Sequence, residues 1–334
     1  MFENLIPLIL ENYGLLYHSI SQVQSGYRNS SYKVILNNHD EINVLIYKAE
    51  ADSLTTVKTA NSLSDHLFAS GLPVRRTLNP KILRLKSQSR TSYAVIYNYL
   101  PGQTIPWESY SKNHIKLTGM AMSRVHARAK DLTLDAKNQA DVCLGLLGRM
   151  RKYLSEPAVQ HAMAQKLKLC VPIAKLDYLE QSLEFGRHLP NQQPLHMDFV
   201  RGNLLFSPST EMSSQLRVGN AIMSGIIDFE KAALSHPVFD VARTLAFLLV
   251  DCPRYPPAKI YKYFLQSGYN KRGESRFAVP ITNGRNLLED YISFFLLYDF
   301  YKFLRHNPYE FLPQNHHFIQ TRDILLARNM VKYS

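Results

Sequence analysis

Two short segments constrain this chain more than any other part of it. Residues 195–206 read Leu-His-Met-Asp-Phe-Val-Arg-Gly-Asn-Leu-Leu-Phe, so the pattern His-x-Asp-x-x-x-x-Asn is followed by an apolar run. Residues 226–230 read Ile-Ile-Asp-Phe-Glu, and residues 221–227 before that aspartate are mostly apolar. A polar stretch rich in Ser, Thr and Asn separates the two apolar runs. Two apolar runs joined by such a stretch predict a β-hairpin, here with candidate ligands at both ends.

The residue types in these segments suit phosphoryl transfer from a nucleotide. That reaction needs a carboxylate to orient and deprotonate the attacking hydroxyl, and oxygen ligands that hold Mg²⁺ against the phosphates. Asp198 fits the first role. Asn203 and Asp228 fit the second, because Mg²⁺ takes one or two carboxylates together with phosphate oxygens and water. Arg201, in the same loop, either pairs with the transferring phosphoryl group or an anionic substrate, or is a surface arginine.

Several further motifs occur in order along the chain. With them, the chain resembles the superfamily of aminoglycoside phosphotransferases, choline kinases and type II homoserine kinases, whose fold is similar to that of protein kinases. The resemblance covers roughly residues 20 to 265 and rests on the two segments above and on four more: Gly71-Leu72-Pro73-Val74, Tyr97-Asn98-Tyr99-Leu100-Pro101-Gly102, the helix Gly119–His126, and Pro237-Val238-Phe239-Asp240-Val241-Ala242-Arg243.

The resemblance implies an α+β protein with a bilobal, protein-kinase-like fold. Residues 1–100 are expected to form a nucleotide-binding small lobe, with a five-stranded antiparallel sheet plus a helix capped by Asp52. Residues 101–334 are expected to form a larger, mainly helical lobe that carries catalysis and substrate binding. Asp240 is expected to anchor the catalytic loop, with Arg243 as its ion-pair partner, and His196 is expected to be structural.

The same resemblance assigns a nucleotide site, for ATP or GTP, to the small lobe. Backbone N–H groups of the turn that contains Ser25, Gly26 and Asn29 would cover the phosphates. Tyr97 and Tyr99 lie where the adenine would pair with hinge backbone.

The phosphate-binding lysine is where the sequence departs from the family's pattern. Relatives carry Lys or Arg in the middle of the third strand, and here that strand reads Asn43-Val44-Leu45-Ile46-Tyr47-Lys48. Lys48 either reaches the phosphates from one step along the strand or is an ordinary surface lysine. The partner glutamate is also missing, because residues 53–66 contain no Glu.

Composition restricts the function classes. The net charge of +12 comes from 39 basic and 27 acidic residues, but the basic residues form no long stripe with interleaved aromatics, so no nucleic-acid partner is expected. Three scattered cysteines give no disulfide framework or zinc pair. No apolar run approaches the length that spans a bilayer, and the start lacks the features of a signal peptide, so we expect a cytoplasmic protein without a membrane partner.

The functional prediction is an ATP- and Mg²⁺-dependent phosphotransferase acting on a hydroxyl of a small molecule: an amino alcohol, amino acid, sugar or aminoglycoside-like compound. Asp198, Arg201 and Asn203 share the Asp-x-x-Arg-x-Asn loop of type II homoserine kinases, which favours a small amino alcohol or amino acid. The low acidic content argues against a polycationic substrate. The missing lysine and glutamate leave an alternative open, a nucleotide-binding pseudokinase with a regulatory or scaffolding role.

Overall fold

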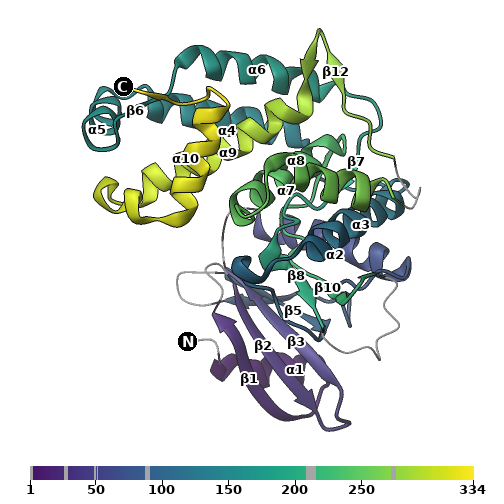
Figure 1. Cartoon of the computed structure of the whole chain (residues 1–334). Helices are drawn as coiled ribbons and strands as arrows, with labels where there is room; N and C mark the ends of the chain where they lie inside the picture. The colour runs from purple at the N-terminus through teal and green to yellow at the C-terminus, as the bar shows by residue number, and fades with distance from the viewer. Residues whose placement is uncertain are drawn as a thin grey trace.

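The computed structural model describes residues 3–25, 29–48, 50, 52–86, 91–207, 216–271 and 276–334. A β-rich small lobe comes first in the chain and a larger helical lobe follows it (Figure 1). This confirms the predicted bilobal α+β fold. Among the described residues, no helix combines the length and the apolar character that crossing a lipid bilayer requires.

The small lobe is built on an antiparallel sheet with strand order β1-β2-β3-β5-β4. Side chains alternate across each strand, so Val34 of β2 and Val44 and Ile46 of β3 point to one face, where they pack on Ile9 and Leu10 of the first helix. The opposite face points toward the second helix and the large lobe. The elements are η1 (Glu3–Leu5), α1 (Ile6–Asn12), β1 (Tyr17–Ser25), β2 (Ser30–Leu36), β3 (Glu41–Tyr47), α2 (Ser53–Ala69), β4 (Leu83–Lys86) and β5 (Thr91–Asn98).

Two local details of this lobe concern the starts of its helices. Pro7 lies in the first turn of α1, where no N–H partner is needed, so it does not interrupt the helix. Asp52 precedes α2 but makes no capping hydrogen bond, so the prediction of a cap is wrong. Its backbone is left-handed (φ 65°), and its carboxylate pairs instead with Lys137 at 3.2 Å.

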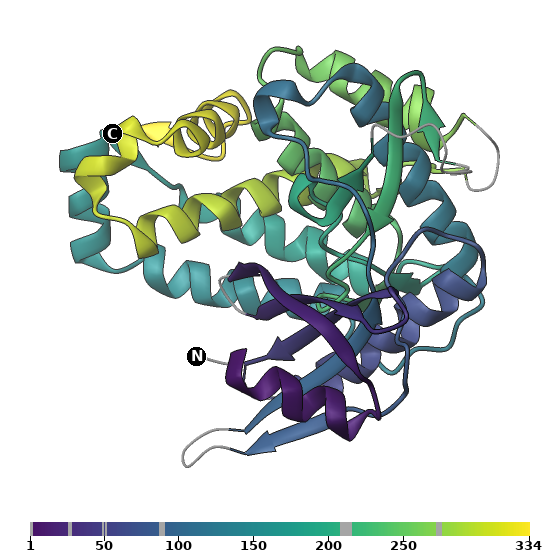
Figure 2. The ribbon, with the colours of Figure 1, turned by 90° about the horizontal axis from the view of Figure 1, so that it is seen from below.

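Two of the first helices of the large lobe, α4 and α6, pack on the long helix α9 (Figure 2). The helical segment that begins with Pro157–Ala162 continues as a π-helical turn to Leu167, and a new helix begins directly after Pro172. The elements in this part are η2 (Trp107–Ser109), α3 (Lys112–Ala129), α4 (Gln139–Leu154), α5 (Pro157–Ala162), the π-helical turn η3 (Met163–Leu167), β6 (Leu169–Cys170) and α6 (Ile173–Arg187).

The predicted hairpin follows, and then the C-terminal helices. β8 pairs with β10 in antiparallel register, and β7 pairs with β11. The first motif segment therefore connects β7 to β8, and the second connects β10 to β11. The elements are β7 (Gln193–Leu195), η4 (Arg201–Asn203), β8 (Leu204–Phe206), β9 (Arg217–Val218), β10 (Ala221–Ile226), β11 (Ala233–Ser235), α7 (Val238–Asp251), α8 (Pro257–Tyr261), the π-helical η5 (Lys262–Tyr269), β12 (Ile281–Thr282), β13 (Arg285–Asn286), α9 (Leu287–His306), η6 (Tyr309–Gln314), α10 (His316–Ala327) and β14 (Lys332–Tyr333).

The segment between β5 and η2 ties the lobes together. Gly102 has φ 119°, and a Cβ there would lie 2.1 Å from Ser224 Oγ, so only glycine fits. Gln103 then exchanges two backbone hydrogen bonds with Phe206 of β8 (2.9 and 2.8 Å). The boundary predicted at residue 100 lies in this segment and stays a prediction.

The apolar core does not stop between the lobes. Leu63 and Leu67 of α2, with Leu72 and Val74 after it, belong to the same buried cluster as α3 and α9. The helix of the small lobe therefore packs on the large lobe, and the segment after α2 is held against it.

Candidate active site

Asp198 and Asn203 are brought into direct contact by a tight loop after β7. The Asn203 side-chain amide donates to the backbone oxygen of Asp198 (2.9 Å) and to its carboxylate Oδ2 (3.0 Å). These bonds occupy the amide nitrogen of Asn203, so its amide oxygen is the atom left to bind a cation. Met197 has φ 60°, a strained conformation for a side chain of this size, of the kind found at functional loops.

Asp228 reaches the same loop from β10. The backbone N–H of Ile227 donates to the Asn203 carbonyl (3.0 Å), and the Ile227 carbonyl lies 3.2 Å from Nε2 of His196. Asp228 itself is left-handed (φ 63°), a conformation that Asp and Asn tolerate better than other side chains. The structure thus brings Asp198, Asn203 and Asp228 to one place.

The donor set at this place suits a hard cation. Among the described residues, no three His, Cys, Asp or Glu side chains gather as a metal cluster. A bound Mg²⁺ would therefore depend on the Asp228 carboxylate, the Asn203 amide oxygen and the phosphates of a nucleotide. Few protein ligands combined with phosphate oxygens and water are the usual arrangement for Mg²⁺.

A buried carboxylate supports the catalytic loop from below. Asp240, in the first turn of α7, accepts hydrogen bonds from the backbone N–H groups of His196 (2.9 Å) and Met197 (2.8 Å), and it lies 3.1 Å from His126 Nε2. Burial alone would raise the pKa of Asp240, but the hydrogen bond and charge of His126 outweigh burial and lower it. The predicted anchoring role is confirmed.

The predicted partner of Asp240 is wrong. Arg243 lies one turn further along α7, on a face that points toward α9, and it pairs there with Asp299 (3.0 Å). His196 is structural as predicted: its ring is fully buried and its Nδ1 accepts the N–H of Asp198 (3.2 Å). Burial lowers the pKa of His196, although the carboxylates of Asp240, Asp198 and Asp228 act against that shift.

The pH dependence of stability is expected to involve His236, just before α7. Its Nδ1 accepts the N–H of Val238 (3.1 Å), and burial, helped by His126, lowers its pKa to about 4. This folded value lies below the unfolded value of about 6.5, so the stabilisation is present above pH 6.5 and is lost as the pH falls toward 4. We expect a loss of about 1 kcal/mol over this range, after allowance for solvent screening of the partly exposed ring.

Urea unfolding at pH 7, 5.5 and 4.5 measures this loss. The variant His236→Asn should reduce it, because an amide oxygen accepts the same hydrogen bond without titrating. The exposed His161→Asn serves as control and should leave the profile unchanged. A His236→Asn profile as steep as that of the wild type contradicts the prediction.

One residue that contacts Asp198 was not anticipated from the sequence. Lys231 Nζ lies 2.8 Å from Asp198 Oδ1, and the lysine side chain is 48% exposed. It comes from the turn after Asp228, and no spacing rule distinguishes it from other surface lysines. The base candidate therefore has an ammonium group beside it that still faces solvent.

Arg201 points away from this contact, toward α7. Its Nε donates to Asp251 Oδ2 (3.2 Å) and its Nη1 to the backbone oxygen of Ile105 (3.0 Å). The side chain is half-buried and fixed, so the alternative of an ordinary surface arginine loses support. Its role toward a phosphoryl group stays a prediction.

The residues assigned to the phosphate-covering turn are only partly described. Gly26 lies outside the described residues, and Ser25 is the last residue of β1, opposite Ser30. Asn29 Nδ2 donates to Glu230 Oε1 (2.7 Å), a residue of the large lobe two positions after Asp228. Asn29 thereby joins the small lobe to the motif segment of the large lobe.

The two tyrosines assigned to the nucleotide base differ in their surroundings. Tyr97 is buried and its hydroxyl donates to Asn61 Oδ1 (2.6 Å), while Tyr99 donates its backbone N–H to Glu41 (3.3 Å) and lies under the Lys33 ammonium. Lys48 follows the end of β3 and is exposed, with its N–H directed to Asn29 Oδ1 (3.4 Å). Their roles toward a nucleotide stay predictions.

A cavity of about 470 Å³ opens beside the catalytic loop. This volume lies in the range of small-molecule sites. Its walls come from the loop, α7, the end of α9, and α10, and they consist of Val200, Arg201, Gly202, Phe247, Val250, Asp251, Asp299, Lys302, Phe303, His306, Asn307, His317 and Thr321.

The two carboxylates of this cavity are neutralised by the protein itself. Asp251 contacts Arg201 and lies 3.5 Å from His317 Nδ1, and Asp299 contacts Lys302 (2.6 Å) and Arg243. Burial alone would raise the pKa of Asp299, but Arg243 and Lys302 hold it below its usual range. The cavity therefore presents balanced charges rather than a negative wall.

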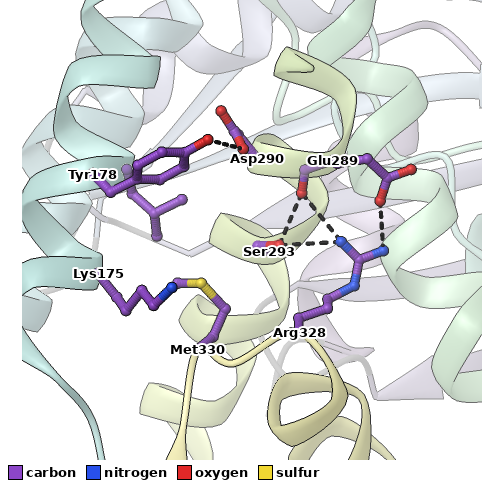
Figure 3. A pocket seen from close by; sticks show the side chains of 8 residues that line it. Lys175, Tyr178, Glu289, Asp290, Ser293, Arg328 and Met330 are labelled. Carbon is purple, nitrogen blue, oxygen red and sulfur yellow. Dashed lines mark hydrogen bonds and ion pairs between the residues drawn. The ribbon is translucent and has the colours of Figure 1, made fainter. Parts of the chain in front are cut away.

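A second cavity, of about 270 Å³, lies far from the catalytic loop between α6, α9 and the C-terminal segment (Figure 3). Arg328 fills one side and bonds to Glu289 and Ser293, while Tyr178 bonds to Asp290. These polar groups are therefore held by one another.

Comparisons with known proteins agree with this geometry. A family model described as "APH: Phosphotransferase enzyme family" matches residues 19–273. The chain belongs to this phosphotransferase family and is a small-molecule phosphotransferase. No curated protein matches it significantly.

Solved structures share the fold at low sequence identity. An amicoumacin kinase, hAmiN, in complex with AMP-PNP, Ca²⁺ and Ami, has 14% identity and a TM-score of 0.69, with 95% of this chain and 93% of that chain covered. A microcompartment-associated aminopropanol kinase has 12% identity and a TM-score of 0.69, covering 98% and 100%. The macrolide 2'-phosphotransferase MphH from Brachybacterium faecium has 16% identity and a TM-score of 0.54, covering 96% and 97%.

Proposed function

We propose that this chain transfers the γ-phosphoryl group of ATP or GTP, with Mg²⁺, to a hydroxyl group of a small molecule held in the cavity beside Arg201. The observation that carries the proposal is the contact between Asn203 and Asp198 (3.0 Å), in a loop whose backbone is also bonded to the residue before Asp228. A base candidate and two oxygen ligands thus share one small space, as phosphoryl transfer requires.

The chain's own residues have distinct tasks in this reaction. The acceptor oxygen forms a bond to the γ-phosphorus as the bond to the β–γ bridging oxygen breaks, and the hydroxyl proton passes to the Asp198 carboxylate. Lys231 holds that carboxylate in place until the acceptor arrives. Asn203 and Asp228 would hold Mg²⁺, which neutralises charge on the phosphate oxygens when bound.

The cavity supports a particular class of acceptor. Its carboxylates already have cationic partners in Arg201 and Lys302, so a polycation would have to displace both. Phe247, Val250 and Phe303 supply apolar wall. A hydroxylated molecule with at most one amino group, such as an amino alcohol or a hydroxy amino acid, fits these surroundings. Kinases of aminopropanol and amicoumacin among the structural neighbours agree with the reaction class.

Consumption of nucleoside triphosphate in the presence of a panel of acceptors tests the proposal. The panel contains amino alcohols, homoserine, neutral polyols and aminoglycosides such as kanamycin, each with ATP and with GTP, with Mg²⁺ or with EDTA. Turnover is expected with acceptors of low charge and only with Mg²⁺. Turnover of aminoglycosides alone contradicts the proposed acceptor class, and no turnover with any acceptor supports the pseudokinase alternative, which the family match does not favour.

The acceptor side of the site predicts a selective effect of Asp251→Asn. The substitution weakens the fixed position of Arg201, so the KM for the acceptor should rise about tenfold while the KM for the nucleotide stays within about twofold. Steady-state kinetics with the best acceptor of the panel measures both values. Asp141→Asn is the matched control, because Asp141 forms the same kind of contact with Arg187 Nε on the surface (2.6 Å). An unchanged acceptor KM in Asp251→Asn contradicts the assignment of the cavity.

A further inference from the structure

Among the described residues, the face of β3 that packs toward α2 carries no cation. Asn43, Leu45 and Tyr47 share this face, because side chains alternate along a strand. The Tyr47 hydroxyl lies 2.7 Å from that of Tyr97, which in turn donates to Asn61 of α2. Two phenols and an amide thus connect the third strand to the following helix, where the resemblance implies an ion pair of lysine and glutamate.

A different cation lies buried close to this network. Arg75 belongs to the segment after α2, which begins with the Gly-Leu-Pro-Val motif at residues 71–74. Ile226 donates its N–H to Pro73 (2.9 Å), and Arg75 donates its own to Ile226 (3.3 Å). Arg75 is therefore fixed in register with the end of β10, two residues before Asp228.

The Arg75 guanidinium lies between the two lobes. Its Cζ is 4.6 Å from the centre of the Tyr97 ring and 5.9 Å from that of Phe229, the residue after Asp228. Both distances are within the range of cation–π attraction. The residue is only 6% exposed.

Two nitrogens of the guanidinium carry hydrogen-bond donors that are not paired with an acceptor among the described residues. They are Nε and Nη2, and both are buried. These two nitrogens form one edge of the planar guanidinium, the edge that binds two oxygens of a phosphate in parallel. A buried cation without hydrogen-bonded oxygens costs free energy, which an anionic ligand would recover.

The electrostatic surroundings keep this arginine charged. Burial alone would lower the pKa of Arg75, but Tyr47, Tyr97, Glu230 and Asp228 raise it above its ordinary value. The carboxylate of Asp228 is thus close enough for its charge to act on the guanidinium.

We propose that Arg75 is the phosphate-binding cation of this site, in place of a lysine on the third strand. The inference rests on the proposed nucleotide-dependent function. The ligand is the polyphosphate of a nucleoside di- or triphosphate, bound through the edge formed by Nε and Nη2. Lys48, the candidate from the sequence, follows the end of β3 and is exposed, whereas Arg75 is anchored to the strand that leads to Asp228.

Calorimetric titrations with a nucleoside triphosphate and with the matching nucleoside separate binding of phosphate from binding of the base. For Arg75→Met, we expect a loss of at least about tenfold in affinity for ATP or GTP and a change within about twofold for adenosine or guanosine. Arg75→Lys keeps the charge but not the paired N–H groups, so its loss should be intermediate. Arg76→Met is the matched control, because Arg76 is the exposed neighbour that stacks on Phe68.

Thermal unfolding distinguishes this role from a structural one. Arg75→Met without ligand should melt no lower than the wild type, because it removes a buried charge whose Nε and Nη2 have no hydrogen-bond partner among the described residues, and its stabilisation by added nucleotide should shrink. A structural role predicts the opposite, a lower melting temperature without ligand and a normal shift with nucleotide.

The outcomes that overturn the inference are distinct from failure of the proposed function. If the wild type binds the triphosphate and Arg75→Met binds it equally well, or loses nucleoside and triphosphate affinity alike, the assignment of Arg75 is wrong. If Lys48→Met alone produces the phosphate-specific loss, Lys48 is the cation instead. A wild type that binds neither nucleotide refutes the proposed function itself.

Discussion

Replacing Asp198 by Asn should lower kcat by about 10³-fold while the affinity for nucleotide stays within about twofold. The substitution preserves the shape of the side chain and the acceptor atom for the Asn203 amide (3.0 Å), but it removes the carboxylate proposed to accept the hydroxyl proton. It also removes the charge that attracts Lys231 (2.8 Å). Initial rates with a saturating acceptor and a separate titration with nucleotide measure the two quantities.

The matched control for this substitution is Asp131→Asn, at an exposed position just after α3. It should leave both quantities unchanged. A kcat for Asp198→Asn within tenfold of the wild type would remove Asp198 from the role of base. A pseudokinase would show no difference between the two variants, because neither would catalyse turnover.

Patterns local in sequence predicted most of the fold and the centre of the site. Asp198 and Asn203 lie in one loop, and the apolar runs that flank the polar stretch force the hairpin that returns the chain to Asp228. The anchoring role of Asp240 came instead from the family resemblance, because Asp240 lies more than 40 residues after His196 and Met197, whose backbone N–H groups donate to it. Residues whose placement depends on a turn or a strand pair next to them are therefore accessible from sequence.

Side chains that meet through tertiary packing were beyond this reasoning. Arg243 pairs with Asp299 rather than Asp240 because the orientation of α7 against α9 decides which face each side chain meets. Asp52 makes no cap because its left-handed backbone points its carboxylate away from the helix, to Lys137. Neither orientation can be read from residue spacing.

Arg75 and the acceptor cavity illustrate the same limit at the level of function. The family pattern placed the phosphate-binding cation on or next to the third strand. The buried arginine comes instead from the segment after α2, which is hydrogen-bonded to β10 of the large lobe. The cavity joins Asp251 at the end of α7 with Asp299 in α9. These two carboxylates are distant in sequence, and they line the same cavity because α7 packs on α9.

The second large effect concerns Asp228, the proposed cation ligand. In the wild type, Mg²⁺ should strengthen nucleotide binding, because the ion joins the protein's oxygens to those of the phosphates. Asp228→Asn should abolish most of that enhancement and lower kcat by about 10³-fold, a loss of the size typical for transition-state electrostatics. Asn is preferred to Ala in this test because Asp228 has φ 63°, which an asparagine adopts with little strain.

Titrations of nucleotide with and without Mg²⁺ measure this enhancement directly, independently of turnover. Asp52→Asn is the matched control, since Asp52 is an exposed aspartate with nearly the same backbone conformation (φ 65°). In Asp52→Asn, Mg²⁺ should strengthen nucleotide binding as much as in the wild type. The control therefore shows that replacing an aspartate with left-handed backbone does not by itself remove the effect of Mg²⁺. If Asp228→Asn keeps the full enhancement, the cation is held elsewhere, and the convergence of Asp228 with Asn203 serves the loop's structure instead of the nucleotide.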